Sequence, residues 1–442
     1  MLKYGYNLSG VTFMQLDNHF QRKSLILNMI NHLGPVSRTA LIEYTAYRPA
    51  TVGALVTELL DENLIVETGF HSNGQGRKRA LLEINKEHIC AIGIYFSAKH
   101  ITYIFSQFDG KVLQRSRTKY SPEKNKALLV AEVSDYVREM LSEFPSKKVV
   151  GIGICKPLVD PLSYKISNSQ SHNSEFFAHW IQDDLSSTLK KEFNLHVDVF
   201  SGVTLPAQAE YTFGVAKGVS NFIWVELSNG IGASIFCNGD AVRGINGIAG
   251  ELGHTNVGAS DPNAKLCYCG KPGCVETLAA WPAIKENIVR ELRRGVISTL
   301  NSKRDTPEEI TVDDVRAAIE ADDRMCKHYV KKAAEHIGLA IANAVTLLNP
   351  KMIVLYGFML DLGDFFLEHL ERTVRENVMF LASDFEIRTS IASESILPLG
   401  ATANIFYAYL QCSDYKWVYR LKPEDVDPYE ANNSISEAPF MY

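Results

Sequence analysis

The sequence has no uninterrupted apolar run long enough to cross a membrane. A membrane-spanning helix needs about 18 or more consecutive apolar residues, and no stretch of the 442 residues approaches that length. The first ten residues, MLKYGYNLSG, also lack the basic and then apolar pattern of a secretory signal peptide. We therefore expect a cytoplasmic protein that makes no contact with a membrane.

An excess of positive charge is missing as well. The formal net charge is −6, so the charge of the whole protein gives no reason to expect binding to nucleic acid. Residues 1–86 differ mildly, because they hold nine lysines and arginines against seven aspartates and glutamates. A local DNA contact in this segment remains open, but the charge alone decides little.

Cysteine is sparse, with eight residues in the whole chain. Disulfides are rare in a reducing compartment, and a free cysteine in apolar surroundings usually behaves as a small core residue. Five of the eight lie scattered among apolar neighbours, and we expect them in the core: Cys90, Cys155, Cys237, Cys326 and Cys412.

The other three cysteines lie close to a histidine in the segment GELGHTNVGASDPNAKLCYCGKPGCVE, residues 250–276. The spacing is His254-x12-Cys267-x-Cys269-x4-Cys274, and three thiolates with one imidazole suit tetrahedral Zn²⁺. Four protein ligands leave no position for an activated water, so we predict a structural zinc. Two alternatives remain open: free buried cysteines, and a zinc-finger nucleic-acid module. The second is disfavoured because no basic recognition helix follows directly.

The N-terminal segment has the pattern of a winged helix-turn-helix. HFQRKSLILNMINHLG predicts a helix that stops at Gly34-Pro35, and Ser37 can cap a second, short helix. After a turn, Pro49 is well placed to start a third helix. Two short strands, LIVETG and ALLEI, flank the polar turn HSNGQGRKR. The third helix, PATVGALVTELLDEN, has the apolar spacing of an amphipathic helix, on Val52, Leu55, Val56, Leu59 and Leu60.

From residue 88 onward, one pattern occurs twice. Residues 88–119 read as three strands, followed by a helix at about 122–143, the strand KVVGIGICKPL, a helix at 176–193 and the strand HVDVF. Residues 221–243 again read as three strands, followed by helices at about 276–293, 311–320 and 324–348, the buried strand KMIVLYG and a helix at about 361–378. We therefore predict two α/β lobes with a ligand-binding cleft between them. The last 30 residues fall outside this pattern, and we assign them no role.

The stretch GINGIAGELGH followed by CYCGKPGCVE resembles the signature of the ROK family, which contains bacterial sugar kinases and sugar-responsive transcriptional regulators. GIGICKPLVDP (151–161) is similar to another family segment, and the resemblance covers about residues 88–412. It implies a two-lobed, actin-like and ribonuclease H-like α/β fold behind an N-terminal winged helix-turn-helix domain. The expected divisions are 1–86 for the DNA-binding domain, 87–200 completed by 395–412 for the first lobe, 201–394 for the second lobe with the zinc loop, and 413–442 for the tail.

The resemblance also implies a sugar site. In the family, the matching glutamates and histidine contact sugar hydroxyls, which carries over to Glu251, His254 and Glu276. A carboxylate can accept hydrogen bonds from two adjacent hydroxyls, and a metal-bound imidazole has a second nitrogen free for another partner. Ser201 could keep one further hydrogen bond to the sugar. The alternative is that the two glutamates are ordinary surface residues.

The segments that carry kinase chemistry in this family are changed here. Family kinases have an Asp-x-Gly-Gly-Thr turn in the first hairpin, where this chain has Tyr95 followed by Phe-Ser-Ala-Lys. The catalytic aspartate lies eight residues before a helix-opening glutamate, and counting back from Glu210 gives Gly202, which cannot take a proton. No aspartate occurs in 92–108 or in 200–216. The second phosphate loop is partly kept as SNGIGA (228–233). We therefore predict that the protein is not an enzyme.

The resemblance gives the N-terminal segment a role, because ROK regulators are similar to ROK kinases preceded by a winged helix-turn-helix. The third helix would lie in the major groove, and the basic turn would contact phosphates or the minor groove. The alternative is a protein-docking module with a solvated hairpin tip. The predicted DNA contacts are Arg38, Arg48, Thr51, Thr57, Arg77, Lys78 and Arg79.

The leading hypothesis is a sugar-responsive transcriptional regulator, expected to be a repressor, with a sugar or sugar phosphate as effector. Helix-turn-helix proteins read half-sites as dimers, so we expect a homodimer or homotetramer on a near-palindromic DNA operator. Two alternatives stay open. One is an active sugar kinase with an accessory DNA-binding domain, and the other is a DNA-binding regulator with a vestigial sugar site that a protein partner controls.

Overall fold

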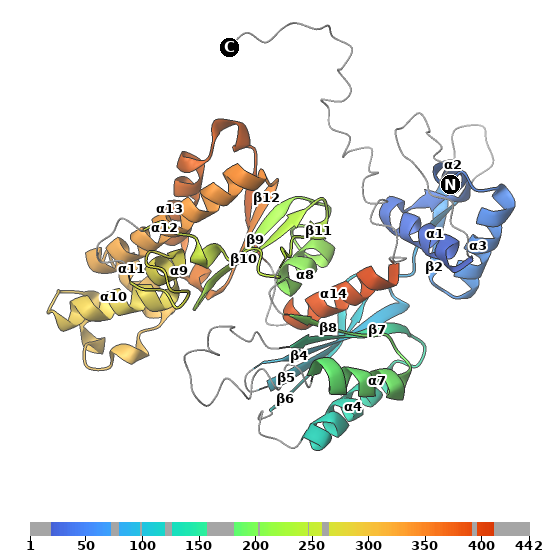
Figure 1. Cartoon of the computed structure of the whole chain (residues 1–442), viewed down its shortest axis with the longest axis horizontal. Helices are drawn as coiled ribbons and strands as arrows, with labels where there is room; N and C mark the ends of the chain where they lie inside the picture. The colour runs from blue at the N-terminus through green and yellow to red at the C-terminus, as the bar shows by residue number, and fades with distance from the viewer. Residues whose placement is uncertain are drawn as a thin grey trace, which may run out of the picture.

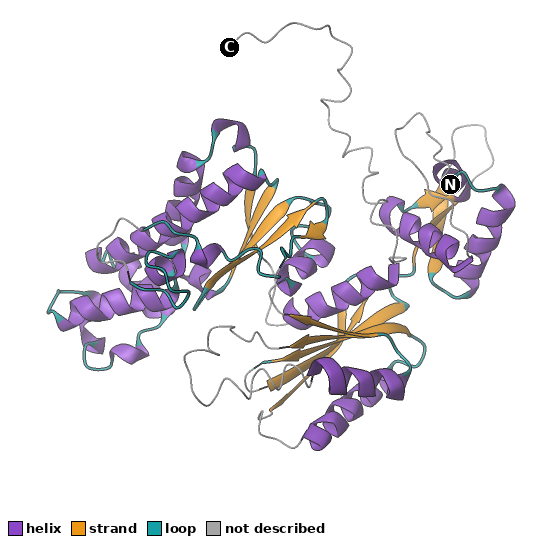
Figure 2. Cartoon of the chain, in the orientation of Figure 1, coloured by secondary structure: helices purple, strands orange, loops and turns teal. Residues whose placement is uncertain are grey.

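The computed structural model describes residues 19–71, 79–97, 100–119, 126–156, 181–201, 204–245, 247–258, 265–390 and 396–410. Figure 1 shows an N-terminal unit and two α/β lobes, and Figure 2 shows that each of the three parts has its own sheet. Within these ranges, no helix has the length and apolar character needed to cross a membrane.

The N-terminal unit contains the three helices that the sequence predicts, namely α1 (His19–Leu33), α2 (Arg38–Thr45) and α3 (Pro49–Asp61). The Oγ of Ser37 accepts a hydrogen bond from the Ala40 N–H at 3.2 Å, which caps α2. Pro49 occupies the first turn of α3, where its missing N–H has no intrahelical partner to lose. The helices pack on a small sheet of order β1-β3-β2, made of β1 (Val36–Ser37), β3 (Arg79–Ile84) and β2 (Ile65–His71).

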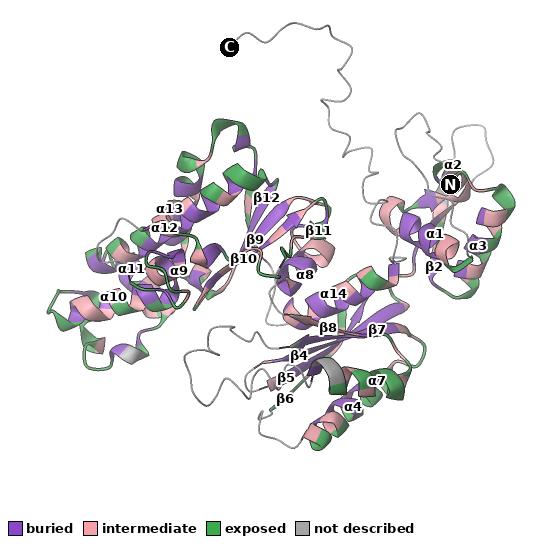
Figure 3. Cartoon of the chain, viewed as in Figure 1, coloured by how far each residue is buried: buried purple, intermediate pink, exposed green. Residues whose placement is uncertain are grey.

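The predicted apolar face of α3 is confirmed. Val52, Leu55, Val56 and Leu59 are at most 1% exposed, whereas Leu60 is half-buried. Their cluster also includes residues of the C-terminal helix α14 (Ile396–Leu410), so the N-terminal core continues into the lobe that follows. Figure 3 shows stretches of α1, α3 and α14 as buried.

The first lobe is a five-stranded sheet with helices on both faces. Its strand order is β6-β5-β4-β7-β8, and α4 and α7 lie on one face while α14 lies on the other (Figure 1). The elements are β4 (Ile89–Phe96), β5 (His100–Gln107), β6 (Val112–Lys119), α4 (Lys126–Glu143), β7 (Lys148–Lys156), the π-helical turn η1 (Ile181–Leu185), α7 (Ser186–Phe193) and β8 (Val197–Ser201).

The second lobe repeats this topology, as the sequence predicts, with the strand order β11-β10-β9-β12-β13. Here α8 (Leu205–Phe213) covers one face and α12 (Arg324–Leu348) covers the other. The last strand, β13, is an element that the sequence reading did not predict. The strands are β9 (Phe222–Leu227), β10 (Ile231–Cys237), β11 (Asp240–Ala241), β12 (Met352–Tyr356) and β13 (Glu386–Thr389).

The helix predicted at about 276–293 is divided in the structure. It ends and restarts at Ala280, whose backbone is extended, because the ring of Pro282 cannot continue a helix across this point. The two pieces are α9 (Val275–Ala279) and α10 (Trp281–Arg293). The remaining helices are η2 (Leu252–His254), η3 (Thr299–Lys303), η4 (Pro307–Glu309), α11 (Val312–Glu320), η5 (Phe358–Leu362), α13 (Asp364–Asn377) and η6 (Phe380–Ala382).

Candidate functional site

The four predicted metal ligands come together in the second lobe. One atom from each of His254, Cys267, Cys269 and Cys274 lies within 4.8 Å of the others. Two pairs are closer: Cys267 Sγ is 3.5 Å from His254 Nδ1, and Cys269 Sγ is 3.5 Å from Cys274 Sγ. Tetrahedral zinc with Zn–S and Zn–N bonds of about 2.3 and 2.0 Å needs ligand separations of roughly 3.5–3.8 Å. The cluster could therefore hold a metal ion.

Short backbone pairings hold this loop in shape. Isolated bridges join Leu266 to Pro272 and Asn256 to Cys274, and Gly270 and Gly273 have the positive φ angles that the tight turn requires. Cys267 is 2% exposed and Cys274 is fully buried, while Cys269 is half-buried. The loop thus places three thiols around one point, mostly shielded from water.

The thiols differ in acidity in ways that follow from this geometry. Burial raises the pKa of Cys267, and burial raises the pKa of Cys274 to about 12. A hydrogen bond from the Lys271 backbone N–H lowers the pKa of Cys269. Because the thiolate is the form that binds a metal, Cys269 is the readiest ligand of the three.

The second nitrogen of His254 faces away from the thiols. Its Nε2 is 2.6 Å from the hydroxyl of Tyr268, and the two rings meet edge to face with centroids 4.8 Å apart. The same Nε2 is 3.7 Å from Glu251 Oε2. Sequence reasoning missed Tyr268. Its position between the predicted ligands Cys267 and Cys269 could have drawn attention to it, but the spacing of metal ligands is read from cysteine and histidine and passes over a tyrosine.

The two glutamates predicted for a sugar site border the same turn. Glu276 lies in the first turn of α9, and its Oε2 accepts a hydrogen bond from the Ile231 N–H at 3.1 Å. A β-carbon on Gly253 would lie 3.3 Å from the Glu276 β-carbon, so this glutamate packs directly against the turn that carries Glu251 and His254. Three of the four predicted sugar contacts are therefore neighbours. The fourth, Ser201, ends β8, but its side chain lies outside the described residues.

The two positions where family kinases carry acids are only partly described. Tyr95 lies on β4, and burial raises the pKa of its phenol to about 12, so it stays neutral. Gly202 lies outside the described residues.

The predicted DNA contacts fall on the N-terminal unit. Arg48 and Thr51 lie at the start of α3, and Arg48 is exposed. Thr57 is exposed, and its hydroxyl donates to the Gly53 carbonyl at 2.9 Å. Arg38 forms an ion pair with Glu67, with Nη1 and Oε1 3.0 Å apart, a partner that the sequence reading did not identify. Arg77 and Lys78 lie outside the described residues, as does the Arg79 side chain.

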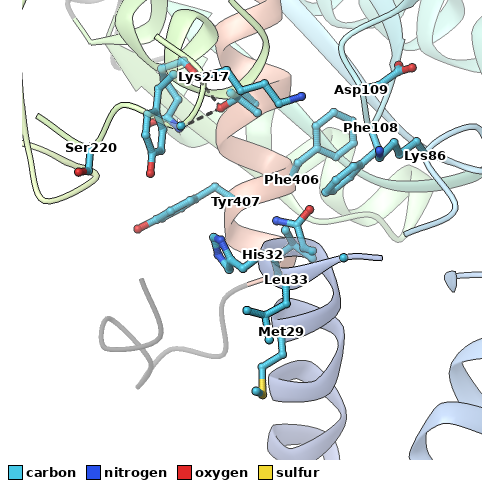
Figure 4. A pocket seen from close by; sticks show the side chains of 18 of the residues that line it. Met29, His32, Leu33, Lys86, Phe108, Asp109, Lys217, Ser220, Phe406 and Tyr407 are labelled. Carbon is cyan, nitrogen blue, oxygen red and sulfur yellow. Dashed lines mark hydrogen bonds between the residues drawn. The ribbon is translucent and has the colours of Figure 1, made fainter. Parts of the chain in front are cut away.

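A cavity of about 550 Å³ lies where the N-terminal unit meets both lobes. Figure 4 shows His32 and Leu33 of α1 on one side, Phe406 and Tyr407 of α14 along the middle, and Lys217 beyond them. Its lining does not include the metal-ligand cluster or the glutamates beside it. We regard it as the junction between the parts rather than as the chemical site.

Comparisons with known proteins agree with this architecture. The sequence profile of the ROK family matches residues 91–403. The chain is 28% identical over 398 residues to the xylose repressor of Caldicellulosiruptor bescii, and this match covers 89% of this chain and 97% of that protein. It is 26% identical over 396 residues to the N-acetylglucosamine repressor of Escherichia coli O157:H7, covering 87% of this chain and 94% of the relative.

Solved structures show the same fold. A ROK family transcriptional regulator described as a homologue of the Escherichia coli MLC protein superposes with a TM-score of 0.70 at 24% identity, over 88% of this chain and 96% of that one. The ROK hexokinase of Thermus thermophilus superposes with a TM-score of 0.55 at 19% identity, over 73% of this chain and all of the hexokinase. The hexokinase thus matches a smaller share of this chain than the regulator does.

Proposed function

Because the chain belongs to the ROK family, we propose that it is a sugar-responsive DNA-binding transcriptional regulator, specifically a repressor of genes for carbohydrate uptake or catabolism. The observation that carries this proposal is the extent of the match to the xylose repressor. The alignment with the repressor extends over 398 residues and covers 97% of that protein. The family profile matches only residues 91–403 of this chain, so it leaves out the N-terminal unit. This chain therefore has a counterpart for nearly the whole of a repressor.

The N-terminal unit supplies the DNA-binding half of the proposal. α3 follows α2 after a short turn and presents Arg48 and Thr51 at its N-terminus, where recognition helices contact base edges. One such unit offers few phosphate contacts. We therefore infer that the protein acts as a homodimer or homotetramer on a near-palindromic operator.

The turn beside the metal-ligand cluster supplies the effector half. Glu251, His254 and Glu276 offer two carboxylates and an imidazole nitrogen to the hydroxyls of a sugar or sugar phosphate. We infer that the four ligands hold Zn²⁺, whose contribution would be structural, because a complete shell leaves no open position for a reacting water. The three cysteines and His254 would thereby fix the turn that carries Glu251.

Phosphoryl transfer is not part of the proposal. A sugar kinase needs a base for the attacking hydroxyl and a cradle for the phosphates. This chain has Tyr95 and Gly202 where the family resemblance leads one to expect acids, and a phenol with a pKa of about 12 cannot replace a carboxylate at neutral pH. The ROK hexokinase shows that the fold itself can belong to a kinase, so the alternative needs a direct assay.

The first experiment measures operator binding against sugar concentration. We expect the purified protein to bind a promoter fragment of a carbohydrate gene in a fluorescence anisotropy assay, and we expect one sugar to weaken that binding about 5- to 150-fold. D-Xylose and N-acetyl-D-glucosamine are the first sugars to test. DNA binding that no sugar changes would refute the sensor half and favour control by a protein partner.

A coupled assay of ATP consumption separates the regulator from the kinase. The protein is tested with D-glucose, D-xylose and N-acetyl-D-glucosamine, and the Thermus thermophilus ROK hexokinase serves as the positive control. We expect no turnover above the rate without sugar. Turnover that depends on sugar would overturn the proposal in favour of an active kinase with an accessory DNA-binding unit.

A further inference from the structure

We propose that Tyr268 is an internal competitor of the effector. Its hydroxyl occupies the hydrogen-bonding position on His254 that a sugar hydroxyl would take, so the sugar must displace the tyrosine in order to bind. This inference rests on the proposed function, because it assumes a sugar at Glu251, His254 and Glu276. It adds a residue that sets the effector concentration at which the regulator responds.

The geometry of the imidazole supports this role. His254 Nδ1 faces the thiols, at 3.5 Å from Cys267 Sγ, so a bound metal would take this nitrogen. The other nitrogen, Nε2, then carries the ring proton and donates it. The Tyr268 hydroxyl already occupies this position, with Nε2 and Oη 2.6 Å apart. One N–H makes one good linear hydrogen bond, so a sugar hydroxyl and Tyr268 cannot both hold it at full strength.

The apolar burial that Tyr268 loses on rotating is limited in this structure. The residue is 43% exposed, so its ring gives up little apolar burial when it rotates away. The carboxylate of Glu251 lies 3.7 Å from Nε2 and is about half exposed, which leaves it able to accept a hydrogen bond from an incoming hydroxyl. The sugar would therefore replace the hydroxyl of Tyr268 and gain Glu251 as a second partner.

The cysteines on either side of Tyr268 keep it next to His254, where it competes with the sugar. Tyr268 lies between Cys267 and Cys269, so an ion bound by these cysteines would also hold the tyrosine backbone beside His254. The Tyr268 hydroxyl is thus tethered next to the His254 Nε2–H at a high effective concentration. In this proposal the side chain of Tyr268 rotates away while the loop keeps its place.

The test is the variant Tyr268→Phe, measured as the zinc-loaded full chain by isothermal titration calorimetry with D-xylose, D-glucose and N-acetyl-D-glucosamine. Phenylalanine keeps the ring and removes the hydroxyl. Since a net hydrogen bond to a neutral partner is modest, we expect the sugar Kd to fall by about 2- to 10-fold. Tyr329→Phe is the matched control, because its hydroxyl donates to Glu291 at 3.2 Å on α10, outside this cluster, and it should leave the Kd unchanged.

The outcomes separate this inference from the proposed function. Wild-type protein that binds a sugar while Tyr268→Phe binds it equally or more weakly would overturn the competitor role and leave the sugar sensor intact. Binding by the variant alone would support the inference. Failure of both proteins to bind any of the three sugars would refute the sensor and the competitor together. A lower zinc content in Tyr268→Phe would mean that the tyrosine supports the metal ligand instead, which also overturns the inference.

Discussion

The side chains of the metal-ligand cluster differ in exposure and acidity, so we expect them to contribute unequally to metal binding. Cys269 is the half-buried thiol whose pKa is lowered by the Lys271 N–H. We predict that Cys269→Ser lowers the zinc content from one ion per chain to well under half after dialysis, measured by inductively coupled plasma mass spectrometry. Serine is a poor ligand for zinc, which prefers thiolate and imidazole.

Cys237→Ser provides the control for this prediction. Cys237 is also partly buried but ends β10 outside the metal-ligand cluster, so its variant should keep a full complement of zinc. Equal zinc contents in the two variants would mean that the cluster does not bind the ion as proposed.

Glu251 gives a second prediction at this scale. Its carboxylate is about half exposed and lies 3.7 Å from His254 Nε2. We predict that Glu251→Gln weakens sugar binding about 10-fold or more, because hydrogen bonds to a charged acceptor contribute about 1.5–3 kcal/mol. Thermal shift at increasing sugar concentration measures the change. Glu320→Gln, at an exposed end of α11, is the control, and an equal shift in both variants would exclude Glu251 from the site.

At the scale of single residues, the sequence predicts the metal ligands better than it predicts which side chains form hydrogen bonds or ion pairs with each other. The spacing of His254 and the cysteines identified four residues that the structure brings within 4.8 Å, because zinc ligands follow known intervals. It did not reveal Tyr268, whose partner is fixed by the folded turn. Nor did it reveal that Arg38 is paired with Glu67, which comes 29 residues later on another element.

Among the elements, the turn η2 depends on a close approach to β10. A β-carbon on Gly253 would lie 2.2 Å from the Ile231 carbonyl oxygen, so any side chain must push the turn away from the strand. We predict that Gly253→Ala lowers the free energy of unfolding by about 1–3 kcal/mol and the melting temperature by a few degrees. It should also weaken sugar binding, since Glu251 and His254 move with the turn. Calorimetry with and without sugar measures both effects.

Gly232→Ala is the control for this element. A β-carbon at Gly232, on β10 itself, would meet no atom within 4 Å. Its variant should therefore keep the wild-type sugar affinity. If Gly253→Ala bound sugar as tightly as Gly232→Ala does, the position of the turn would be irrelevant to the effector.

In the proposed function, DNA recognition depends on the start of α3. Arg48 is exposed, caps no N–H with its side chain and has no ion-pair partner among the described residues. We predict that Arg48→Ala weakens operator binding about 5- to 150-fold, the loss of one arginine contact of about 1–3 kcal/mol. Arg38→Ala should weaken operator binding less than Arg48→Ala does, because Arg38 must first break its ion pair with Glu67 before it can contact DNA. Anisotropy at one fixed salt concentration tests the order, and the reverse order would refute this placement.

Helix and strand positions were largely predictable because the apolar periodicity is strong, as in α3 and in the two sets of three strands. Two elements differed for physical reasons. Pro282 divides the helix predicted at 276–293, since its ring blocks a continuous helix. The strand β13 is four residues long and mostly exposed, so its sequence lacks the apolar run that predicts a buried strand. It is recognised only by its pairing with β12.

Across the whole molecule, the two lobes meet through equivalent helices. α8 covers one face of the second sheet, α14 covers one face of the first, and the two helices pack against each other between the sheets. At its C-terminal end α14 also touches α1, where the Asn28 amide donates to the Leu410 carbonyl at 3.3 Å. A change in the angle between the lobes can therefore reach the N-terminal unit through α14.

The junction cavity gives this route a test. Its volume of about 550 Å³ leaves space between α1, the first lobe and the segment of the second lobe that joins α8 to β9 and contains Ser220 (Figure 4). We predict that Ser220→Trp fills part of this space and restricts movement of the N-terminal unit relative to the lobes. The coupling between sugar and operator, expected at about 5- to 150-fold, should then fall at least threefold.

The measurement is a thermodynamic cycle, with operator Kd determined by anisotropy without sugar and at a saturating sugar concentration. Because coupling is reciprocal, the sugar Kd with and without operator must give the same factor, which checks the cycle internally. Lys332→Trp, at an exposed position of α12 outside the cavity lining, adds the same side chain where no movement is expected and should keep the wild-type coupling. If Ser220→Trp also kept it, the signal would have to pass between lobes and DNA by another path, such as the linker between β3 and β4.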